Sequence, residues 1–257
     1  DGMGALYRGL MLGLRDYIDK NGFPGVVLGL SGGIDSAIVA ALAVDALGAE
    51  RVHAVMMPSP YTSQESLDDA ADLAGRLGIR LDEISIAPAM QAMGDMMAPQ
   101  FDGKSADITE ENIQSRLRGL ILMGISNKHG PLVLATGNKS EYAAGYSTLY
   151  GDMCGGFAPI KDVWKVQVFD LCRWRNANMP RGGAGPEGEV IPVRIIDKPP
   201  SAELRPDQKD TDSLPPYERL DAIMKALCEE MVDIETIAAR GYDRDEVAHA
   251  SQLLFRA

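Results

Sequence analysis

Serines, glycines and an aspartate stand together in the segment SGGIDS, residues 31–36, between an apolar run and a helix-like stretch. Gly32 and Gly33 allow backbone N–H groups to point at a ligand without an obstructing Cβ. Ser31 and Ser36 add hydroxyl donors, and the N-terminus of the following helix adds a partial positive charge. This set of donors suits a pyrophosphate group. The carboxylate of Asp35 fits beside phosphates if Mg²⁺ lies between them.

The segment differs from two common phosphate-binding motifs. No lysine follows the glycines, as it does in a Walker loop, and the three-glycine spacing of a dinucleotide fingerprint is missing. A simpler interpretation is that SGG forms a tight turn and that Asp35 caps the helix. The complete hexapeptide, placed between a strand and a helix, favours phosphate binding over this simpler interpretation.

The order of apolar runs and helical periods along the chain predicts an α/β fold. Such alternation is typical of a doubly wound parallel sheet, here of five strands, flanked by helices. The expected strands span residues 26–30, 52–57, 80–86, 132–135 and 190–195. The expected helices span residues 4–20, 35–47, 63–78, 162–176, 216–231 and 243–255.

A further helix is expected to begin at Thr109, which is a suitable N-cap residue. Its predicted buried stripe consists of Ile113, Leu117, Leu120 and Ile121. Two stretches that contain Gly and Pro, residues 93–105 and 182–213, are expected to be loops. We expect residues 58–63 and part of 198–213 to be mobile without ligand and to become ordered when ligands bind.

Three polar loops follow predicted strands and are candidates for one binding site. They are SGGIDS, PSPYTSQ at residues 58–64 and TGNKSEYAAGYSTLYGD at residues 136–152. Ligands bind at the carboxyl ends of the strands in open parallel sheets. The sequence therefore predicts that the three loops meet in one crevice.

Composition narrows the range of partners. The 257-residue chain has a formal net charge of −12, which argues against a nucleic-acid partner because phosphate backbones require an excess of Lys and Arg. No apolar run is long enough to span a membrane, so no membrane partner is expected. Three widely spaced cysteines suggest no disulfide framework and favour the reducing cytoplasm. The three histidines are scattered along the sequence, which argues against a zinc site built from histidines.

SGGIDS resembles the SGGxDS loop of the N-type ATP pyrophosphatases, a superfamily with the adenine nucleotide alpha hydrolase-like fold. Three further segments resemble NAD synthetases: ENIQSRLRG at residues 111–119, LATGNKSEYAAGYSTLYGDMCGGFAPIKDVWK at residues 134–165 and PSAELRPDQKDTDSLPPYERLD at residues 200–221. The resemblance extends over essentially the whole chain and is strongest to the synthetase domain of the glutamine-dependent type.

The resemblance implies a ligase that forms a C–N bond. Its substrates would be deamido-NAD, ATP and ammonia, its cofactor Mg²⁺, and its products NAD, AMP and pyrophosphate. It implies one synthetase domain over residues 1–257, with an N-terminal glutaminase domain and a C-terminal tail outside this chain. It also implies a homodimer or higher homo-oligomer that forms through this domain.

The resemblance also implies roles for individual residues. Asp35 and Glu141 would be the catalytic residues and the ligands of Mg²⁺. The implied ATP-binding residues are Gly29, Leu30, Ser31, Gly32, Gly33, Ile34, Asp35, Ser36, Gln64, Thr136 and Lys165. The implied deamido-NAD-binding residues are Asn112, Arg116, Glu141, Tyr146, Ser147, Thr148 and Leu149.

Several alternatives remain open. Arg116 could be an ordinary solvated residue, Lys161 and Lys165 could lie on a solvated helix face, and Tyr146 could be a packing aromatic. Ammonia-dependent relatives have an arginine close to the place of Pro58, so its contact with the triphosphate must come from elsewhere in this chain. Another adenylating enzyme, such as a tRNA-modifying ligase, and a nucleotide-binding regulatory module without catalysis are the competing hypotheses.

Overall fold

A parallel sheet of four strands forms the centre of the protein, in the order β3-β2-β1-β4. The computed structural model describes residues 2–206 and 208–257, and residue 207 of the predicted loop 182–213 lies outside the described residues. The strands are β1 (Val26–Gly29), β2 (Val52–Met56), β3 (Arg80–Glu83) and β4 (Leu132–Val133). The α/β class and the parallel sheet agree with the sequence prediction, but the predicted number of five strands is wrong for the described residues.

The strand order places a switch point beside β1. Val26 of β1 lies opposite Val52 of β2 on one side and Leu132 of β4 on the other. The chain runs outward from β1 through β2 to β3 and then returns to β4 on the opposite side of β1. Loops that leave neighbouring strands at such a point diverge and open a crevice at the carboxyl ends.

The predicted fifth strand at residues 190–195 is absent because its backbone groups bond to a side chain. The Asn176 side-chain oxygen accepts hydrogen bonds from the N–H groups of Val190 at 3.1 Å and Ile191 at 2.9 Å. The Asn176 amide nitrogen donates to the Ile191 carbonyl at 2.7 Å. Pro192 then precedes a short helix, α8 (Val193–Asp197). Val190, Ile191 and Ile195 are buried without a strand neighbour, whereas Val193 is exposed.

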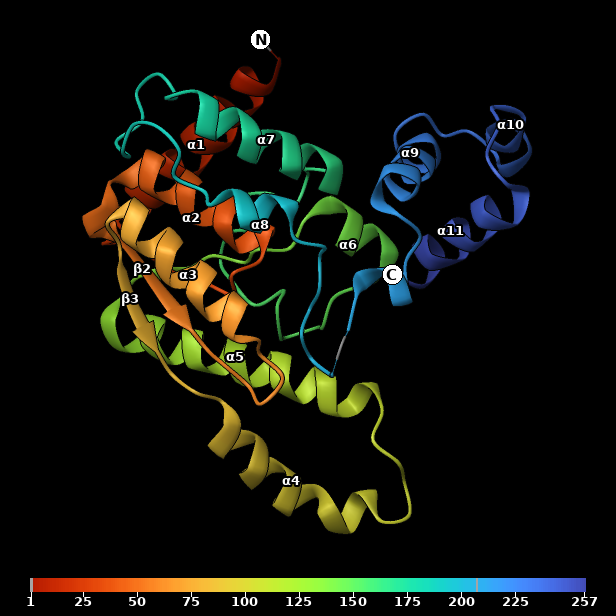
Figure 1. Cartoon of the computed structure of the whole chain (residues 1–257), viewed down its shortest axis with the longest axis horizontal. Helices are drawn as coiled ribbons and strands as arrows, with labels where there is room; N and C mark the ends of the chain where they lie inside the picture. The colour runs from red at the N-terminus through yellow and green to blue at the C-terminus, as the bar shows by residue number, and fades with distance from the viewer. Residues whose placement is uncertain (1, 207) are drawn as a thin grey trace.

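Helices cover both faces of the sheet (Figure 1). One layer contains α1 (Gly2–Lys20), α2 (Ile34–Leu47), α3 (Gln64–Leu77) and α7 (Lys165–Ala177), and α2 contacts each of the other three. Nearly every residue of α2 is buried, which fits a helix that is apolar on all sides. The other layer contains α5 (Ile108–His129), with α4 (Ala87–Phe101) packed against it.

The α4 helix occupies part of the stretch 93–105 that was predicted to be a loop. Pro88 lies in its first turn, where proline is compatible with a helix, and Pro99 lies near its end. Gly94 and the prolines suggested a loop, but the intervening Ala, Met and Gln residues are good helix formers.

The α5 helix begins two residues earlier than predicted and buries a different face. Asp107 is its N-cap and forms a capping box with Glu110, in place of Thr109. Leu120 is 68% exposed, so its assignment to a buried stripe is wrong. The buried residues of the helix are Gln114, Ser115, Gly119 and Leu122. This face consists largely of small and polar residues because it lines the site described below.

The C-terminal helices form a group at one side of the molecule, beside α6 (Lys139–Ala144) (Figure 1). They are α9 (Tyr217–Cys228), α10 (Ile234–Ala239) and α11 (Arg244–Arg256). Two short 3-10 helices, η1 (Ala49–Arg51) and η2 (Asp210–Asp212), complete the described elements. None of the described helices combines the length and the apolar character that crossing a membrane requires.

Candidate active site

A cavity of about 360 Å³ opens where the carboxyl ends of β1, β2 and β4 meet. The predicted site residues that line it are Gly29, Leu30, Ser31, Gly33, Ile34, Asp35, Ser36, Asn112, Thr136, Glu141, Tyr146, Ser147, Thr148 and Lys165. All three predicted loops contribute, and residues 200–204 with 208 and 210 form a further wall. The cavity has the size of a small-molecule site.

Four predicted residues lie elsewhere. Gly32 lines a smaller adjoining cavity of about 120 Å³. The exposed Gln64 amide donates to Asp68 at 2.8 Å, and the exposed Arg116 donates from Nε to the Leu149 carbonyl at 3.2 Å. Leu149 itself is 58% exposed. Neither cavity is lined by Gln64, Arg116 or Leu149.

The SGGIDS segment forms a tight cradle held by its own serines. Gly33 N–H donates to Ser31 Oγ at 3.2 Å, and the Ser36 hydroxyl donates to the Gly33 carbonyl at 3.0 Å. Gly32 has a φ of +78°, and a Cβ there would lie 2.2 Å from the Ser66 carbonyl oxygen. Only glycine fits at this position. The loop leads directly into α2, whose first turn faces the cavity with its free N–H groups.

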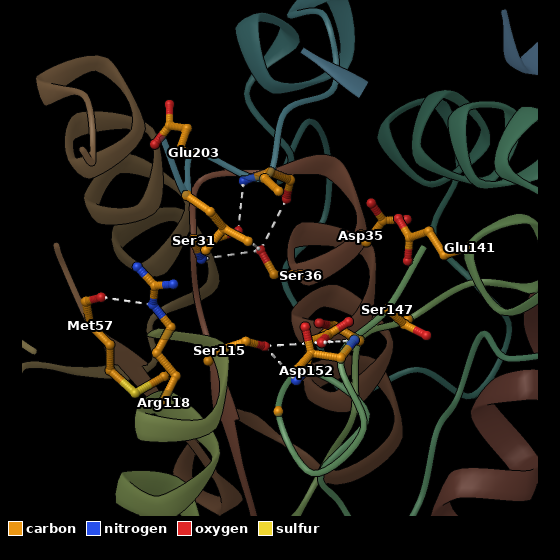
Figure 2. Close-up of a pocket in the computed structure, with 18 of the residues that line it drawn as sticks. Ser31, Asp35, Ser36, Met57, Ser115, Arg118, Glu141, Ser147, Asp152 and Glu203 are labelled. Carbon is orange, nitrogen blue, oxygen red and sulfur yellow. Dashed lines mark hydrogen bonds between the residues drawn. The ribbon is translucent and has the colours of Figure 1, made fainter. Parts of the chain in front are cut away.

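Asp35, Glu141 and Lys165 meet at one wall of the cavity, although they come from three helices. The Lys165 ammonium donates to Asp35 Oδ2 at 2.5 Å and to Glu141 Oε1 at 3.2 Å. Figure 2 shows the two carboxylates side by side at the cavity. The side chain of Lys165 is only 2% exposed, whereas those of Asp35 and Glu141 are 18% and 16% exposed. The carboxylates therefore remain accessible to a ligand.

Asn138 holds this arrangement in place. It is the N-cap of α6: its side-chain oxygen accepts from Glu141 N–H at 3.1 Å, and its own N–H donates to Glu141 Oε2 at 3.2 Å. Its amide nitrogen donates to Asp35 Oδ1 at 2.8 Å. The segment TGNKSE thus folds as a capping box that connects the two carboxylates. Lys139, in contrast, pairs with Glu229 outside the cavity.

Burial and neighbouring charges shift the pKa values of Glu141 and Lys165. Burial raises the pKa of Glu141 to about 8, with a further contribution from the Asp35 charge and an opposing one from Lys165. Burial disfavours the charged form of Lys165, but Asp35 and Glu141 outweigh this effect and raise the pKa of Lys165 above its ordinary value. The raised pKa of Glu141 means that its carboxyl group keeps its proton to a higher pH than a free glutamate does.

Asp210 is a site residue that the sequence interpretation missed. It lies in η2, lines the cavity and accepts from the Tyr217 hydroxyl at 2.8 Å and the Tyr146 hydroxyl at 3.4 Å. Burial raises the pKa of Asp210, and Lys165 acts in the opposite direction. The Lys165 ammonium also lies 5.1 Å from the centre of the Tyr217 ring. The sequence signal was the acidic segment DQKDTD, where no single residue stood out.

The loop 146–152 is fixed to α5 by polar contacts. Thr148 Oγ1 donates to the Asn112 side-chain oxygen at 2.9 Å, which leaves the Asn112 amide hydrogens for a ligand. Asp152 Oδ1 accepts from Thr148 N–H at 2.7 Å and from the Ser115 hydroxyl at 3.0 Å. A Cβ at Gly151 would lie 2.3 Å from Ser115 Oγ, so glycine permits this close contact.

One face of α5 forms a wall of the cavity, and its spacing explains a missed residue. The lining residues of this helix are Ile108, Glu111, Asn112, Ser115, Arg118, Gly119 and Leu122. They recur at three- and four-residue intervals, as one helical face must. The sequence interpretation followed the apolar stripe and therefore overlooked Arg118. Arg116 was predicted on the face of Asn112, but it lies outside the cavity.

Asp35 and Glu141 fit Mg²⁺ by the chemistry of their donors. Both are hard oxygen donors with lone pairs beyond those used by Asn138 and Lys165. Among the described residues, no group of three or more His, Cys, Asp or Glu side chains could hold a metal ion. A cation at these two carboxylates would need further oxygen ligands from a bound molecule. Mg²⁺ commonly binds in this way, with one or two carboxylates and phosphate oxygens.

The parallel sheet, the glycine–serine loop at the switch point and the facing charged groups define an α/β protein with a candidate phosphate-binding loop at the carboxyl edge of its sheet. The model of the NAD synthase family matches residues 6–256, so this chain belongs to the NAD synthase family. The family predicted from the SGGIDS, ENIQSR and TGNKSE segments is confirmed.

Curated relatives agree with this family. The glutamine-dependent NAD(+) synthetase of Rhodobacter capsulatus is 59% identical over 249 residues, which cover 97% of this chain and 45% of the relative. The enzyme of the same name from Acinetobacter baylyi is 51% identical over 256 residues, covering 100% of this chain and 46% of the relative. This chain therefore spans less than half of the length of these relatives.

Solved structures are similar as well. A glutamine-dependent NAD+ synthetase from Acinetobacter baumannii, in complex with ADP, is 48% identical to this chain with a TM-score of 0.71. The matched region covers 97% of this chain and 43% of that synthetase chain. An NMN synthetase from Francisella tularensis is 27% identical to this chain with a TM-score of 0.80. The matched region covers 99% of this chain and 93% of the NMN synthetase chain.

Proposed function

We propose that this chain catalyses the ATP-dependent amidation of deamido-NAD to NAD. The observation that carries the proposal is the cluster of Asp35, Glu141 and Lys165 beside the SGGIDS cradle in one cavity. In the first step a nicotinate carboxylate oxygen attacks the α-phosphorus of ATP, and pyrophosphate leaves. In the second step the nitrogen of ammonia attacks the activated carbonyl carbon, AMP leaves with the former carboxylate oxygen, and one proton is released.

The cradle would bind the polyphosphate. Phosphate oxygens would accept hydrogen bonds from the N–H groups in the first turn of α2 and from the hydroxyls of Ser31 and Ser36. Lys165, which contacts Asp35 of the cradle, would add a positive charge. Asp35 and Glu141 would hold Mg²⁺, which when bound neutralises the charge that develops on the phosphates. Positioning and charge stabilisation would supply most of the acceleration, because neither step needs a protein nucleophile.

The deamido-NAD substrate would lie along α5 and the loop 146–152. Asn112, Tyr146, Ser147 and Thr148 line this part of the cavity. The free amide hydrogens of Asn112 suit a ribose or phosphate oxygen. Arg116 and Leu149 lie outside the cavity and would contact this substrate only if it extends beyond the cavity.

Exposed apolar side chains on neighbouring elements support a homodimer. Met96, Ile108, Leu120, Leu149 and Tyr150 are each more than half exposed, on α4, on α5 and on the loop bound to α5. Exposed apolar side chains that form a common patch mark interfaces. We expect sedimentation velocity to give a dimer, and Leu120→Glu to give a monomer. A native monomer at micromolar concentration would contradict the dimer.

The part of the relatives that makes them glutamine-dependent would lie in the half of their sequence that this chain does not match. We therefore expect this chain to use ammonium and not glutamine as its nitrogen source. Free cysteines at positions 154, 172 and 228 fit the reducing cytoplasm.

The substrate is tested by product analysis. The purified chain, Mg²⁺, ATP and ammonium are incubated with deamido-NAD or with nicotinate mononucleotide, the acid that corresponds to the product of an NMN synthetase. We expect NAD from the first acid and a much slower reaction with the second. Faster amidation of the mononucleotide would overturn the substrate assignment. If no pyrophosphate is released with either acid, the proposed reaction is wrong.

A further inference from the structure

The large cavity carries more negative than positive side chains. Its ionisable lining comprises the carboxyl groups of Asp35, Glu111, Glu141, Asp152, Glu203 and Asp210 and the cationic groups of Arg118 and Lys165. Lys165 already contacts Asp35 and Glu141. A nucleotide polyanion that enters this cavity therefore needs the second cation, Arg118.

Arg118 is half-buried and has almost no partner. Its Nε donates to the Met57 carbonyl at 3.1 Å, and no described carboxylate lies within ion-pair distance of its guanidinium. Its terminal nitrogens donate to none of the described residues. Burial lowers the pKa of Arg118 to about 10, with an opposing contribution from Glu203. A partly buried guanidinium without a counter-ion loses hydration that a bound anion can replace.

The guanidinium points into the cavity. Figure 2 shows it on the side of the cavity opposite Asp35 and Glu141, with Ser31 between the two sides. Its single anchor, the Met57 carbonyl, fixes the Nε and leaves the fork of terminal N–H groups available to a ligand in the cavity that Arg118 lines. This fork matches two oxygens of a phosphate group.

Pro58, the residue after Met57, offers no group that could bind a phosphate at this place. Pro58, which also lines the cavity, has neither a charged side chain nor a backbone N–H to offer. The second loop therefore provides no cation at the end of β2. Arg118 reaches the same place from α5, since it bonds to the residue immediately before Pro58.

We propose that Arg118 binds a phosphate group of ATP and takes the place of the arginine that the second loop lacks at Pro58. This inference rests on the proposed function for the identity of the nucleotide. Lys165 and Arg118 would then hold the polyphosphate from two sides of the cavity, and the SGGIDS cradle would bind it between them.

Binding measurements that need no turnover test this proposal. Arg118→Gln and Arg118→Lys are compared with the native chain by calorimetric titration with ATP and with adenosine, in the presence of Mg²⁺. Adenosine presents the same base and ribose without phosphate. Arg80→Gln is the matched control, because Arg80 is an exposed arginine on β3 that pairs with Asp82.

We expect Arg118→Gln to weaken ATP binding about tenfold to a hundredfold and to change adenosine binding less than about twofold. Arg118→Lys should recover part of the ATP affinity, and Arg80→Gln should leave both affinities unchanged. Unchanged ATP binding in Arg118→Gln would overturn the proposal. Equal losses for ATP and adenosine would do the same, because they indicate contact with the nucleoside or damage to the fold. ATP binding is measured without deamido-NAD, so this test gives a result even if the proposed amidation proves wrong.

Discussion

Lys165 Nζ lies 2.5 Å from Asp35 Oδ2, across 130 positions of the chain. The contact joins the first residue of α7 to the first turn of α2 and places a carboxylate beside the phosphate cradle. Because Lys165 is almost fully buried and also contacts Glu141, it links two acidic side chains that come from different helices.

The first prediction concerns Asp35→Asn. Asparagine keeps the shape of the side chain and can still bond to Asn138, while Lys165 keeps its contact with Glu141. We expect the fold to persist and the turnover number at saturating Mg²⁺ to fall about a hundredfold or more, because one oxygen ligand and its charge are lost. Steady-state kinetics with a circular dichroism control test this expectation. Near-normal turnover would contradict the role of Asp35.

The second prediction concerns Glu141→Gln and pH. The folded-state pKa of about 8 lies above the unfolded value, so the stability that Glu141 contributes is present at low pH and is lost as pH rises through 8. Glutamine removes this titration. Relative to the native chain, Glu141→Gln should gain up to about 1.4 kcal/mol of unfolding free energy per pH unit between pH 5 and 8.

Urea unfolding of both proteins at several pH values, without metal or nucleotide, measures this difference. Glu83→Gln on β3 serves as a control because Glu83 is an exposed glutamate outside the cavity. A difference between Glu141→Gln and the native chain that does not change with pH would show that Glu141 is ionised throughout this range.

The third prediction concerns the buried pair formed by Asp45 and Arg175. Both side chains are fully buried, and Arg175 donates to Asp45 at 2.6 Å from Nε and at 3.0 Å from a terminal nitrogen. Asp45→Asn leaves the guanidinium without its counter-ion and should cost about 3–5 kcal/mol of unfolding free energy. Asp16→Asn, which breaks an exposed pair with Lys20, should cost less than about 1 kcal/mol. Equal losses in urea unfolding would contradict this account.

The fourth prediction concerns the two segments that border the cavity opening, residues 58–63 and 198–206. They contact each other, because the Ser63 hydroxyl donates to Glu203 Oε1 at 2.8 Å. We expect their amide hydrogens to exchange rapidly without ligand and to become protected together when ATP, Mg²⁺ and deamido-NAD are all present. Hydrogen exchange read by mass spectrometry tests this. Equal protection in the free and bound states would mean that the site is preformed.

The sequence predicted the parts of this molecule that local pattern determines. The apolar run before SGGIDS had to be a buried strand, and the glycines and serines had to form its turn. TGNKSE contains its own capping box, which positions Glu141, although the role of Glu141 was implied only by the resemblance to NAD synthetases. The loops at strand ends converge because parallel strands all end at the same edge of the sheet.

The remaining features depend on tertiary contacts that no local pattern shows. The segment 190–195 is apolar enough for a strand, but Asn176 takes its backbone hydrogen bonds. Leu120 has the spacing of a buried residue, yet it lies on a face that no described element covers. Arg118 and Asp210 gain their importance only from the cavity around them, which chain segments far apart in sequence enclose.

The fate of the carboxylate oxygen tests the central claim most directly. Deamido-NAD labelled with oxygen-18 in its nicotinate carboxylate is incubated with the purified chain, Mg²⁺, ATP and ammonium, and the products are analysed by mass spectrometry. Adenylation predicts one labelled oxygen in the phosphate of AMP and none in pyrophosphate. Label in inorganic phosphate with formation of ADP, or NAD formed with unlabelled AMP, would contradict the account.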